Sequence, residues 1–344
     1  MGKDKMRIGI LSAGGDCPGI NAAIRGVGKT AMVKYGMEVI GISNGFSGLV
    51  DKETALMTEE QLSGILTHGG TILGTSRFKP FKPAEGDTVT DKPQIIKQNY
   101  EELGLDALVC IGGNGTQKTA SLLAKEGLNV VGIPKTIDND VWGTDVTFGF
   151  DSAVWIATDA IDRLHTTANS HKRVMVIEVM GHHAGWIALY SGMAAGGDVI
   201  LLPELDYDLD VIANCLMERS RKGKAYSIVV VGEGIEKPKK KTAAGYIGKK
   251  IMKMTGLETR ETILGYIQRG GSPSPQDRIL ATRYGAYAAD LIHRREFGTM
   301  VSIQGDHITS VPLDEVGGKL RLLQPDHHLI EKGRAMGVCF GGKE

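Results

Sequence analysis

Two carboxylates, Asp138 and Asp140, lie two residues apart in the segment 134–140 (PKTIDND), here called the acid loop. The apolar run at 128–133 predicts a buried strand, which the proline at the start of the acid loop ends. In open α/β sheets, ligands bind outside the carboxyl ends of the strands, so this loop is a candidate site. Two acids placed there indicate one acid–base group and one contact to a metal or substrate.

Two glycine-rich segments, 14–21 (GGDCPGIN) and 112–116 (GGNGT), also follow apolar runs. Glycines let backbone N–H groups approach an anion, and a helix that starts there adds its positive end. Either segment alone is also typical of a tight turn, and neither matches a Walker A or dinucleotide-binding motif. Together with the acid loop they indicate phosphoryl transfer, which requires bound donor phosphates, a metal and a base near the acceptor hydroxyl. Four arginines could clamp a phosphorylated acceptor: Arg77, Arg173, Arg260 and Arg269.

Continuous apolar runs alternate with helical segments along the chain, which is typical of parallel strands covered by helices on both faces. The runs lie at 7–12, 38–42, 107–111, 128–133, 174–179 and 227–231. We therefore expect an α/β fold with mainly parallel, Rossmann-like, three-layer sheets. The stretch 262–292 predicts a helix, and the charged stretch 236–241 predicts a solvated loop.

The charges of the chain are balanced, with 40 Lys and Arg against 40 Asp and Glu in 344 residues. This balance gives no global argument for binding nucleic acid or an anionic membrane. The cysteines at 17, 110, 215 and 339 show no metal-ligand spacing and predict free buried thiols of a reducing compartment. No signal peptide and no apolar run approaching about 18 residues is evident, so we expect a cytoplasmic protein.

In these motifs the chain closely resembles the phosphofructokinase family over roughly residues 6–300. The matching segments occur in the family's order: 14–21, 69–77 (GGTILGTSR), 112–116, 134–140, 180–182 (MGH), Glu233 and 266–273 (YIQRGGSP). The resemblance implies two similar lobes, each a mainly parallel sheet covered by helices. Residues 1–150 plus about 265–318 would form the phosphoryl-donor lobe, and residues 151–264 plus about 319–344 the sugar-phosphate lobe.

The resemblance also implies an activity, the transfer of a phosphoryl group from ATP to the 1-hydroxyl of fructose 6-phosphate, giving fructose 1,6-bisphosphate in glycolysis. By analogy Asp138 is the base, and Thr136 and Arg173 complete the catalytic set. The implied donor site comprises Gly14, Arg77, Phe78, Asn114, Gly115 and Thr116. The implied sugar-phosphate site comprises Thr136, Asp138, Arg173, Met180, Gly181, His182, Glu233, Arg260, Tyr266 and Arg269.

The implied cofactor is Mg²⁺, with Asp140 as its ligand. Asn114 stands where the family usually has a magnesium-binding carboxylate, and a neutral asparagine is a weaker ligand for a hard cation. Family members borrow two arginines from a neighbouring subunit, and Arg173 and Arg260 stand at those positions. The implied assembly is a homotetramer whose active sites are shared between subunits.

The phosphoryl donor depends on two markers that disagree. Gly115 is typical of ATP-using members, whereas Lys135 is typical of pyrophosphate-using members. An aspartate at 115 would put a negative charge where the α-phosphate of the nucleotide sits, and lysine at 135 does not exclude ATP. We therefore expect ATP, with pyrophosphate as the alternative donor.

An effector pocket for ADP or phosphoenolpyruvate is a feature of regulated bacterial members. Arg25 matches that basic pocket, and Lys29 is a like-charged substitute. However, His165 stands where an arginine is expected, and Ala225-Tyr226 occupy a region where another basic residue is expected. Losing fixed positive charges weakens the binding of a polyphosphate, so we expect little or no activation by ADP.

Two other functions compete with this interpretation. A kinase with a similar donor loop, such as a NAD kinase-like or lipid kinase-like enzyme, would account for 112–116. It would not account for the acid loop together with Arg173, Glu233 and Arg260. A non-catalytic sugar-phosphate sensor would account for Asn114, but Asp138, whose loss would favour a sensor, is present. A turnover assay separates these functions.

Overall fold

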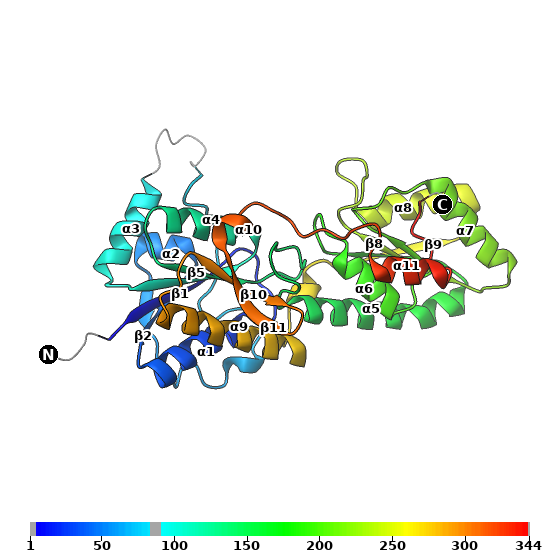
Figure 1. Ribbon diagram of the computed structural model, residues 1–344. Helices are drawn as coiled ribbons and strands as arrows, with labels where there is room; N and C mark the ends of the chain where they lie inside the picture. Colours follow the sequence, from blue (N-terminus) through cyan, green and yellow to red (C-terminus); the bar gives the residue numbers. More distant parts are fainter. Residues whose placement is uncertain (1–4, 83–90, 343–344) are drawn as a thin grey trace. The chain divides into compact units, whose positions relative to one another are not determined.

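The computed structural model describes residues 5–82 and 91–342, which fold into two compact units (Figure 1). Unit 1 comprises Met1–Thr136, Asp140–Asp151 and Arg269–Arg321, and unit 2 comprises Ile137–Asn139, Ser152–Gln268 and Leu322–Glu344. Each unit has its own sheet and its own hydrophobic core. Both units are therefore assembled from segments that are distant in the sequence.

Unit 1 is built on a seven-stranded sheet with the strand order β11-β10-β5-β4-β1-β2-β3. Its strands are β1 (Arg7–Ala13), β2 (Glu38–Ile42), β3 (Thr54–Leu56), β4 (Ala107–Gly112), β5 (Val130–Pro134), β10 (Thr299–Gln304) and β11 (His307–Pro312). The five central strands are parallel, and the edge strands β3 and β11 are antiparallel to their neighbours. Almost every residue of β1, β4 and β5 is buried, which explains their continuous apolar sequences.

Helices cover both faces of this sheet, as Figure 1 shows. Helices α1 (Ile20–Lys29) and α9 (Pro275–His293) pack against each other on one face. The other face is covered by α2 (Phe46–Asp51), α3 (Lys92–Glu102), α4 (Asn114–Lys125) and α10 (Leu313–Val316). The expected three-layer α/β architecture is confirmed.

Unit 2 is built on a parallel four-stranded sheet with the strand order β7-β8-β6-β9. Its strands are β6 (Val174–Val179), β7 (Val199–Leu201), β8 (Ser227–Gly232) and β9 (Thr259–Ile263). The core on one face is closed by α7 (Leu209–Arg221) and α8 (Ala243–Thr255). The other helices of the unit are α5 (Phe150–His171), α6 (Trp186–Ala194) and α11 (His328–Ala335) (Figure 1).

The helix expected over 262–292 is wrong in its first third. Thr262 and Ile263 belong to β9, a short 3₁₀ turn follows at Gly265–Arg269, and α9 begins only at Pro275. Glycines at 265, 270 and 271 and the proline at 273 disfavour a continuous helix. Ser274 then caps α9, because its hydroxyl accepts a hydrogen bond from the N–H of Asp277 (3.2 Å).

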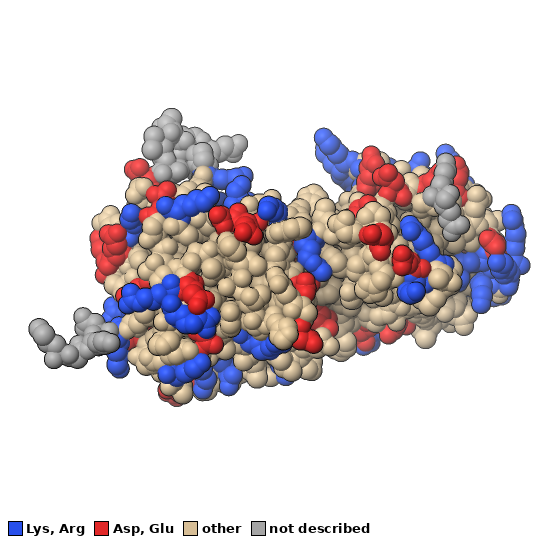
Figure 2. Space-filling model, in the orientation of Figure 1, with Lys and Arg blue, Asp and Glu red and all other residues tan. Residues whose placement is uncertain are grey.

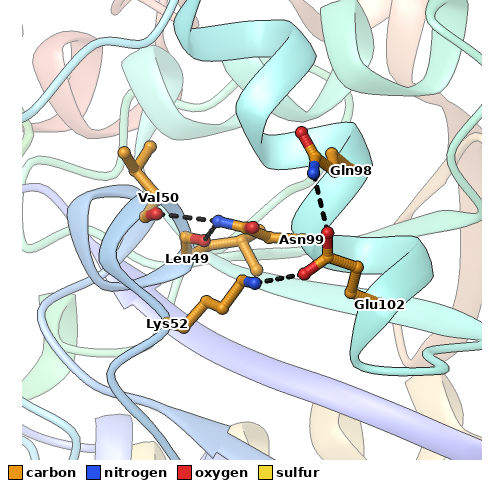
Figure 3. A network of polar contacts seen from close by, with 6 residues as sticks. All are labelled: Leu49, Val50, Lys52, Gln98, Asn99 and Glu102. Atoms are coloured by element: carbon orange, nitrogen blue, oxygen red, sulfur yellow. Dashed lines mark hydrogen bonds and ion pairs between the residues drawn. The ribbon is translucent and has the colours of Figure 1, made fainter.

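Hydrogen bonds from a polar side chain of α3 hold this helix against the end of α2 (Figure 3). Asn99 is buried, and its Nδ2 donates to the carbonyl oxygens of Leu49 (2.9 Å) and Val50 (2.7 Å). These carbonyls lie in the last turn of α2, where no helical N–H is available to them. The salt bridge between Lys52 and Glu102 lies beside this contact.

The surface carries both signs of charge. Figure 2 shows Lys and Arg interspersed with Asp and Glu over the face drawn, with no large area of a single sign. Five of the six residues at 236–241 are exposed, as expected for the solvated loop. None of the helices among residues 5–82 and 91–342 is both long and apolar enough to cross a membrane.

Substitution of Gly285 by alanine is expected to lower the free energy of unfolding by ~1–3 kcal/mol. A Cβ at Gly285 would lie 2.4 Å from the carbonyl oxygen of Ala23 and 2.7 Å from the nitrogen of Val27, both in α1. Gly248 of α8 is the matched control, because a Cβ there would meet no atom closer than 3.6 Å. Gly248→Ala should raise the free energy of unfolding by ~0.5–1 kcal/mol, since alanine is the better helix former. Urea unfolding of both variants tests this, and a stable Gly285→Ala variant would contradict it.

Candidate active site

The acid loop leaves the sheet of unit 1 at the carboxyl end of β5, and hydrogen bonds hold both of its ends. On one side, the Thr147 hydroxyl donates to the carbonyl oxygen of Thr136 (2.7 Å). On the other side, the N–H of Arg321 donates to the carbonyl oxygen of Asp140 (2.8 Å). Asn139 has a φ of 53°, a left-handed conformation that turns the chain sharply just after Asp138. Hydrogen bonds within unit 1 therefore hold both ends of the loop that presents Asp138.

Asn114 and Asp140, the two predicted metal ligands, lie next to each other. The Asn114 Nδ2 donates to the backbone carbonyl of Asp140 (3.2 Å). Burial raises the pKa of the Asp140 carboxyl, and a hydrogen bond from the Asn114 side chain and the charge of Lys135 oppose that shift. The Oδ1 of Asn114 is buried and has no hydrogen-bond partner among the described residues. An amide oxygen and a carboxylate are thus available at the edge of the acid loop.

The donor residues predicted in unit 1 come together where β1 and β4 end. The N–H of Gly14 donates to the Ser76 carbonyl (2.9 Å), and the Thr75 hydroxyl donates to the Gly14 carbonyl (2.8 Å). The Thr116 hydroxyl donates to the carbonyl of Ala13 (3.2 Å). These hydrogen bonds connect the end of β1 and the first glycine segment to Thr116 of the second glycine segment and to the segment 69–77, which carries Arg77.

Arg77 and Phe78, the other two predicted donor residues, have different surroundings. Arg77 is exposed. Phe78 is half-buried and packs against the hydrophobic core of unit 1. The structure therefore gives Arg77 the freedom to meet a ligand and shows a packing role for Phe78.

The two donor markers, Gly115 and Lys135, are placed differently. Gly115 is the second residue of α4 and is exposed, and a Cβ built on it would have no atom within 4 Å. Lys135 is only 3 % exposed, and its ammonium group donates to the carbonyl oxygen of Gly15. Position 115 therefore faces open space, whereas the lysine is built into the first glycine segment.

Arg269 was expected among the sugar-phosphate residues and belongs to unit 1. Its guanidinium lies against Gly15, where a Cβ would be only 1.8 Å from Nη1. Glycine at this position is therefore required for the arginine to approach the first glycine segment.

Other predicted sugar-phosphate residues meet at the carboxyl ends of β6 and β8 in unit 2. The Glu233 Oε1 accepts hydrogen bonds from the N–H groups of Gly181 (3.3 Å) and His182 (2.9 Å). Gly181 and His182 have φ values of 143° and 52°, so a sharp turn exposes these groups to the carboxylate. The N–H of Met180 donates to the Oε1 of Gln268 (3.3 Å). The turn that carries three predicted residues is thus held by two side chains.

Arg173 and Arg260, the arginines expected to be shared between subunits, share one carboxylate. The Glu258 Oε1 lies 3.0 Å from Nη2 of Arg173 and 2.5 Å from Nη2 of Arg260. The hydrogen bond from Arg173 lowers the pKa of Glu258 below its usual value. The Nε of Arg173 is buried and has no partner among the described residues. Tyr266, predicted to bind the sugar phosphate, is 72 % exposed.

Glu204 is a positioning residue that sequence reasoning missed. Its carboxylate oxygens accept from the N–H of Gly185 (2.9 and 3.0 Å) and from the N–H of Leu323 (3.1 Å). Burial raises the pKa of Glu204, and these backbone hydrogen bonds oppose the shift. The sequence offers one signal for Glu204. It directly follows the apolar run 199–202 and Pro203, and the acid loop likewise follows an apolar run that ends at a proline.

His165 and Tyr226, which stand where a regulated family member would have basic residues, form a hydrogen-bonded pair. His165 Nε2 donates to the carbonyl oxygen of Ala195 (2.7 Å), so its Nδ1 accepts from the Tyr226 hydroxyl (3.0 Å) when the ring is neutral. Nearby, Asp198 forms a salt bridge with Arg219 (2.7 Å). His165 and Tyr226 are therefore paired with each other, and Arg219 is paired with Asp198.

The chain is similar to proteins whose activity is known. The family model described as Phosphofructokinase matches residues 7–292. The chain is 64 % identical to "ATP-dependent 6-phosphofructokinase 3" of Bacteroides thetaiotaomicron, over 98 % of this chain and 100 % of the relative. It is 55 % identical to "ATP-dependent 6-phosphofructokinase" of Spirochaeta thermophila, over 97 % of both chains.

Solved structures are similar as well. Phosphofructokinase from Pichia pastoris in the T-state aligns with a TM-score of 0.84 and 33 % identity, over 91 % of this chain and 35 % of that longer chain. A pyrophosphate-dependent phosphofructokinase from Marinobacter aquaeolei aligns with a TM-score of 0.84 and 21 % identity, over 98 % and 92 % of the two chains. At that identity the second likeness concerns the fold alone. With the family model matching most of the chain, the chain belongs to the phosphofructokinase family.

Proposed function

We propose that this chain is an ATP-dependent 6-phosphofructokinase, which transfers the γ-phosphoryl group of ATP to the 1-hydroxyl of fructose 6-phosphate in the cytoplasm. The observation that carries the proposal is the rigid acid loop with Asp138, anchored at Thr136 and Asp140. Relatives at 64 % and 55 % identity bear the name of this activity, and their ATP dependence supports the choice of donor.

Asp138 is the proposed general base. Its carboxylate accepts the proton of the 1-hydroxyl as the oxygen attacks the γ-phosphorus. Asp138 belongs to the short segment Ile137–Asn139 of unit 2, and its chain neighbours Thr136 and Asp140 belong to unit 1, which carries both glycine segments. A fixed loop avoids the reorganisation that a mobile base would need in the transition state.

The donor phosphates are proposed to bind over the glycine segments and the start of α4. Gly14 has a φ of 88°, which lets its backbone follow the turn, and α4 directs its first N–H groups at the same edge. The buried ammonium of Lys135 and the guanidinium of Arg269 add positive charge along the first segment. Fixed donors and charges of this kind stabilise the charge of the transferring phosphoryl group.

A Mg²⁺ ion fits the residues beside the acid loop. The buried Oδ1 of Asn114 lacks a partner among the described residues, and the carboxylate of Asp140 lies next to it. Oxygen ligands of these types suit a hard cation that keeps water and phosphate oxygens as its other ligands. When bound, the ion would offset negative charge on the donor phosphates.

The sugar phosphate is proposed to bind at the carboxyl ends of β6 and β8. The turn held by Glu233 presents Met180, Gly181 and His182. Arg173 and Arg260 are proposed to reach the active site of a neighbouring subunit in a homotetramer. Their common bond to Glu258 sets their geometry in advance, and the Nε of Arg173, which has no partner within 5–82 and 91–342, leaves a buried donor for an anion.

Self-association is supported by the edge of the sheet in unit 2. Strand β9 pairs only with β6 among the described residues, which leaves its other edge open. Ile263, Tyr266 and Ile267 follow along this edge and are 48 %, 72 % and 60 % exposed. An open edge beside exposed apolar side chains is a typical site for a second copy.

Asp138→Asn is expected to reduce kcat by at least ~10²-fold, because an amide cannot accept the hydroxyl proton. The affinity for fructose 6-phosphate, measured by calorimetry, should stay near the wild-type value. Asp162→Asn is the matched control, since Asp162 is exposed on α5 and undergoes the same chemical change. Retention of near-normal kcat by Asp138→Asn would refute the assignment of the base and with it the proposed mechanism.

The donor is tested by offering ATP and pyrophosphate separately with Mg²⁺ and fructose 6-phosphate. We expect the wild-type protein to show the higher kcat/KM with ATP. Gly115→Asp should lower kcat/KM for ATP by ~10-fold or more, by placing charge against the nucleotide phosphates. The variant should fold normally, because position 115 faces open space and an acid in the first turn of a helix is favourable.

Gly115→Ala is the control for this experiment, since it adds bulk without charge. Its loss of ATP activity should be smaller than that of Gly115→Asp. A higher kcat/KM with pyrophosphate in the wild-type protein would overturn the proposed donor but not the proposed acceptor.

ADP is expected to leave the fructose 6-phosphate saturation curve nearly unchanged. His165 and Tyr226 bond to each other where a regulated relative would offer fixed cations. Allosteric coupling typically changes affinity by about 5-fold or more. Saturation curves with and without ADP, at constant ATP, measure the effect, and a shift of 5-fold or more would show that an effector site exists.

A further inference from the structure

Two cysteines that are 124 positions apart in the numbering, Cys215 and Cys339, meet at the surface of unit 2. Cys215 lies on α7, and Cys339 lies in the segment after α11. The carbonyl of Cys339 accepts from the N–H of Ile200 in β7 (2.9 Å), and its N–H donates to the carbonyl of Asp198 (3.0 Å). Cys339 is therefore held in place by the sheet, and α7 brings Cys215 to it.

The two thiols share a side-chain hydrogen bond. Both residues are half-buried, and they line a surface cavity of about 810 Å³ together with Glu218, Arg334 and Phe340. Of the four thiols predicted to be buried, only those of Cys17 and Cys110 are. These two thiols are therefore both close enough to interact and open to a small reagent.

The two thiols are coupled through this hydrogen bond. The bond to Cys339, followed by burial, raises the pKa of Cys215, while the charge of Arg219 opposes this shift and the charge of Asp198 adds to it. Arg334 also lines the cavity. The thiol that loses its proton first can accept the S–H of the other as a hydrogen bond.

We propose that Cys215 and Cys339 form a dithiol site that reacts with low-molecular-weight disulfides and closes to an intramolecular disulfide. The thiolate of one cysteine attacks one sulfur of the reagent, forms a mixed disulfide and releases the first thiolate. The other cysteine then loses its proton to solvent, attacks the protein sulfur of the mixed disulfide and releases the second thiolate, which takes up a proton. Two electrons pass from the protein dithiol to the reagent, which leaves as two thiols.

The bond would tie the C-terminal segment to α7. The segment after α11 already pairs with β7 through the backbone of Cys339. Before α11, the N–H of Leu323 donates to the carboxylate of Glu204, which also accepts a hydrogen bond from the N–H of Gly185. The disulfide would close a long loop in the unfolded chain and so raise the stability of the folded state. The site is therefore a modification site that fastens the C-terminal segment to unit 2.

The test treats the folded full-length protein with oxidised glutathione, followed by alkylation, intact mass measurement and peptide mapping without reduction. We expect a product that is two hydrogen atoms lighter, with a cross-linked peptide that joins Cys215 to Cys339. The buried Cys17 and Cys110 serve as internal controls and should alkylate only after denaturation. A lasting mixed disulfide on one cysteine with the other still free, or no reaction at either, would overturn the proposal.

Single serine variants separate closure from simple modification. Each single variant, Cys215→Ser or Cys339→Ser, should stop at one bound glutathione on its remaining cysteine, and neither variant should lose two hydrogens. Oxidation should raise the thermal midpoint of the wild-type protein, reversibly with a reducing agent, and should not raise that of either variant. An equal rise in a serine variant would contradict the cross-link as its cause, and the wild-type peptide map remains decisive if a variant fails to fold.

Discussion

The site depends on the register of the parallel strands. In unit 1, Ala13 pairs with Gly112, and Gly112 pairs with Pro134, so β1, β4 and β5 end at one level. The two glycine segments and the acid loop therefore leave the sheet side by side. In unit 2, Val179 pairs with Gly232 in the same way, which brings the turn after β6 to the acid that follows β8. Because these strands are buried on both faces, a slip by one residue would turn every side chain to the opposite face and disrupt the packing against the helices there.

The buried ammonium group of Lys135 influences the ionisation of the groups around it. A buried ammonium group loses its hydration, and a neutral carbonyl such as that of Gly15 compensates for this only in part. The charge is felt by neighbouring groups, since it opposes the upward pKa shifts that burial causes in Cys17 and Asp140. The ammonium group of Lys135 thus adds positive charge beside the first glycine segment, in which Asp16 supplies a negative charge.

Much of the fold follows from local patterns, whereas the site depends on contacts between distant segments. Apolar runs predicted six strands correctly, because buried parallel strands are apolar throughout. Five strands were missed, namely β3, β7, β9, β10 and β11. Of these, β9 is a partly exposed edge strand with a polar sequence, which gives no apolar run. The motifs located Asp138 and Glu233, but no spacing rule predicts that the Lys135 ammonium reaches Gly15. The sequence likewise does not predict that Cys215 meets Cys339. The Lys135–Gly15 and Cys215–Cys339 contacts both depend on how distant segments pack around the finished sheets.

The strand order of unit 1 also affects how the chain folds during its synthesis. Strand β5 lies between β4 and β10, yet β10 follows it only after roughly 160 residues that mostly build unit 2. At about 5–20 residues per second, the ribosome needs roughly 8–30 s to supply that missing neighbour. During this interval the growing chain carries an apolar strand with an unpaired edge, which can pair with another chain. Chaperone binding to the nascent segment that carries β5 would protect the strand that later presents the acid loop.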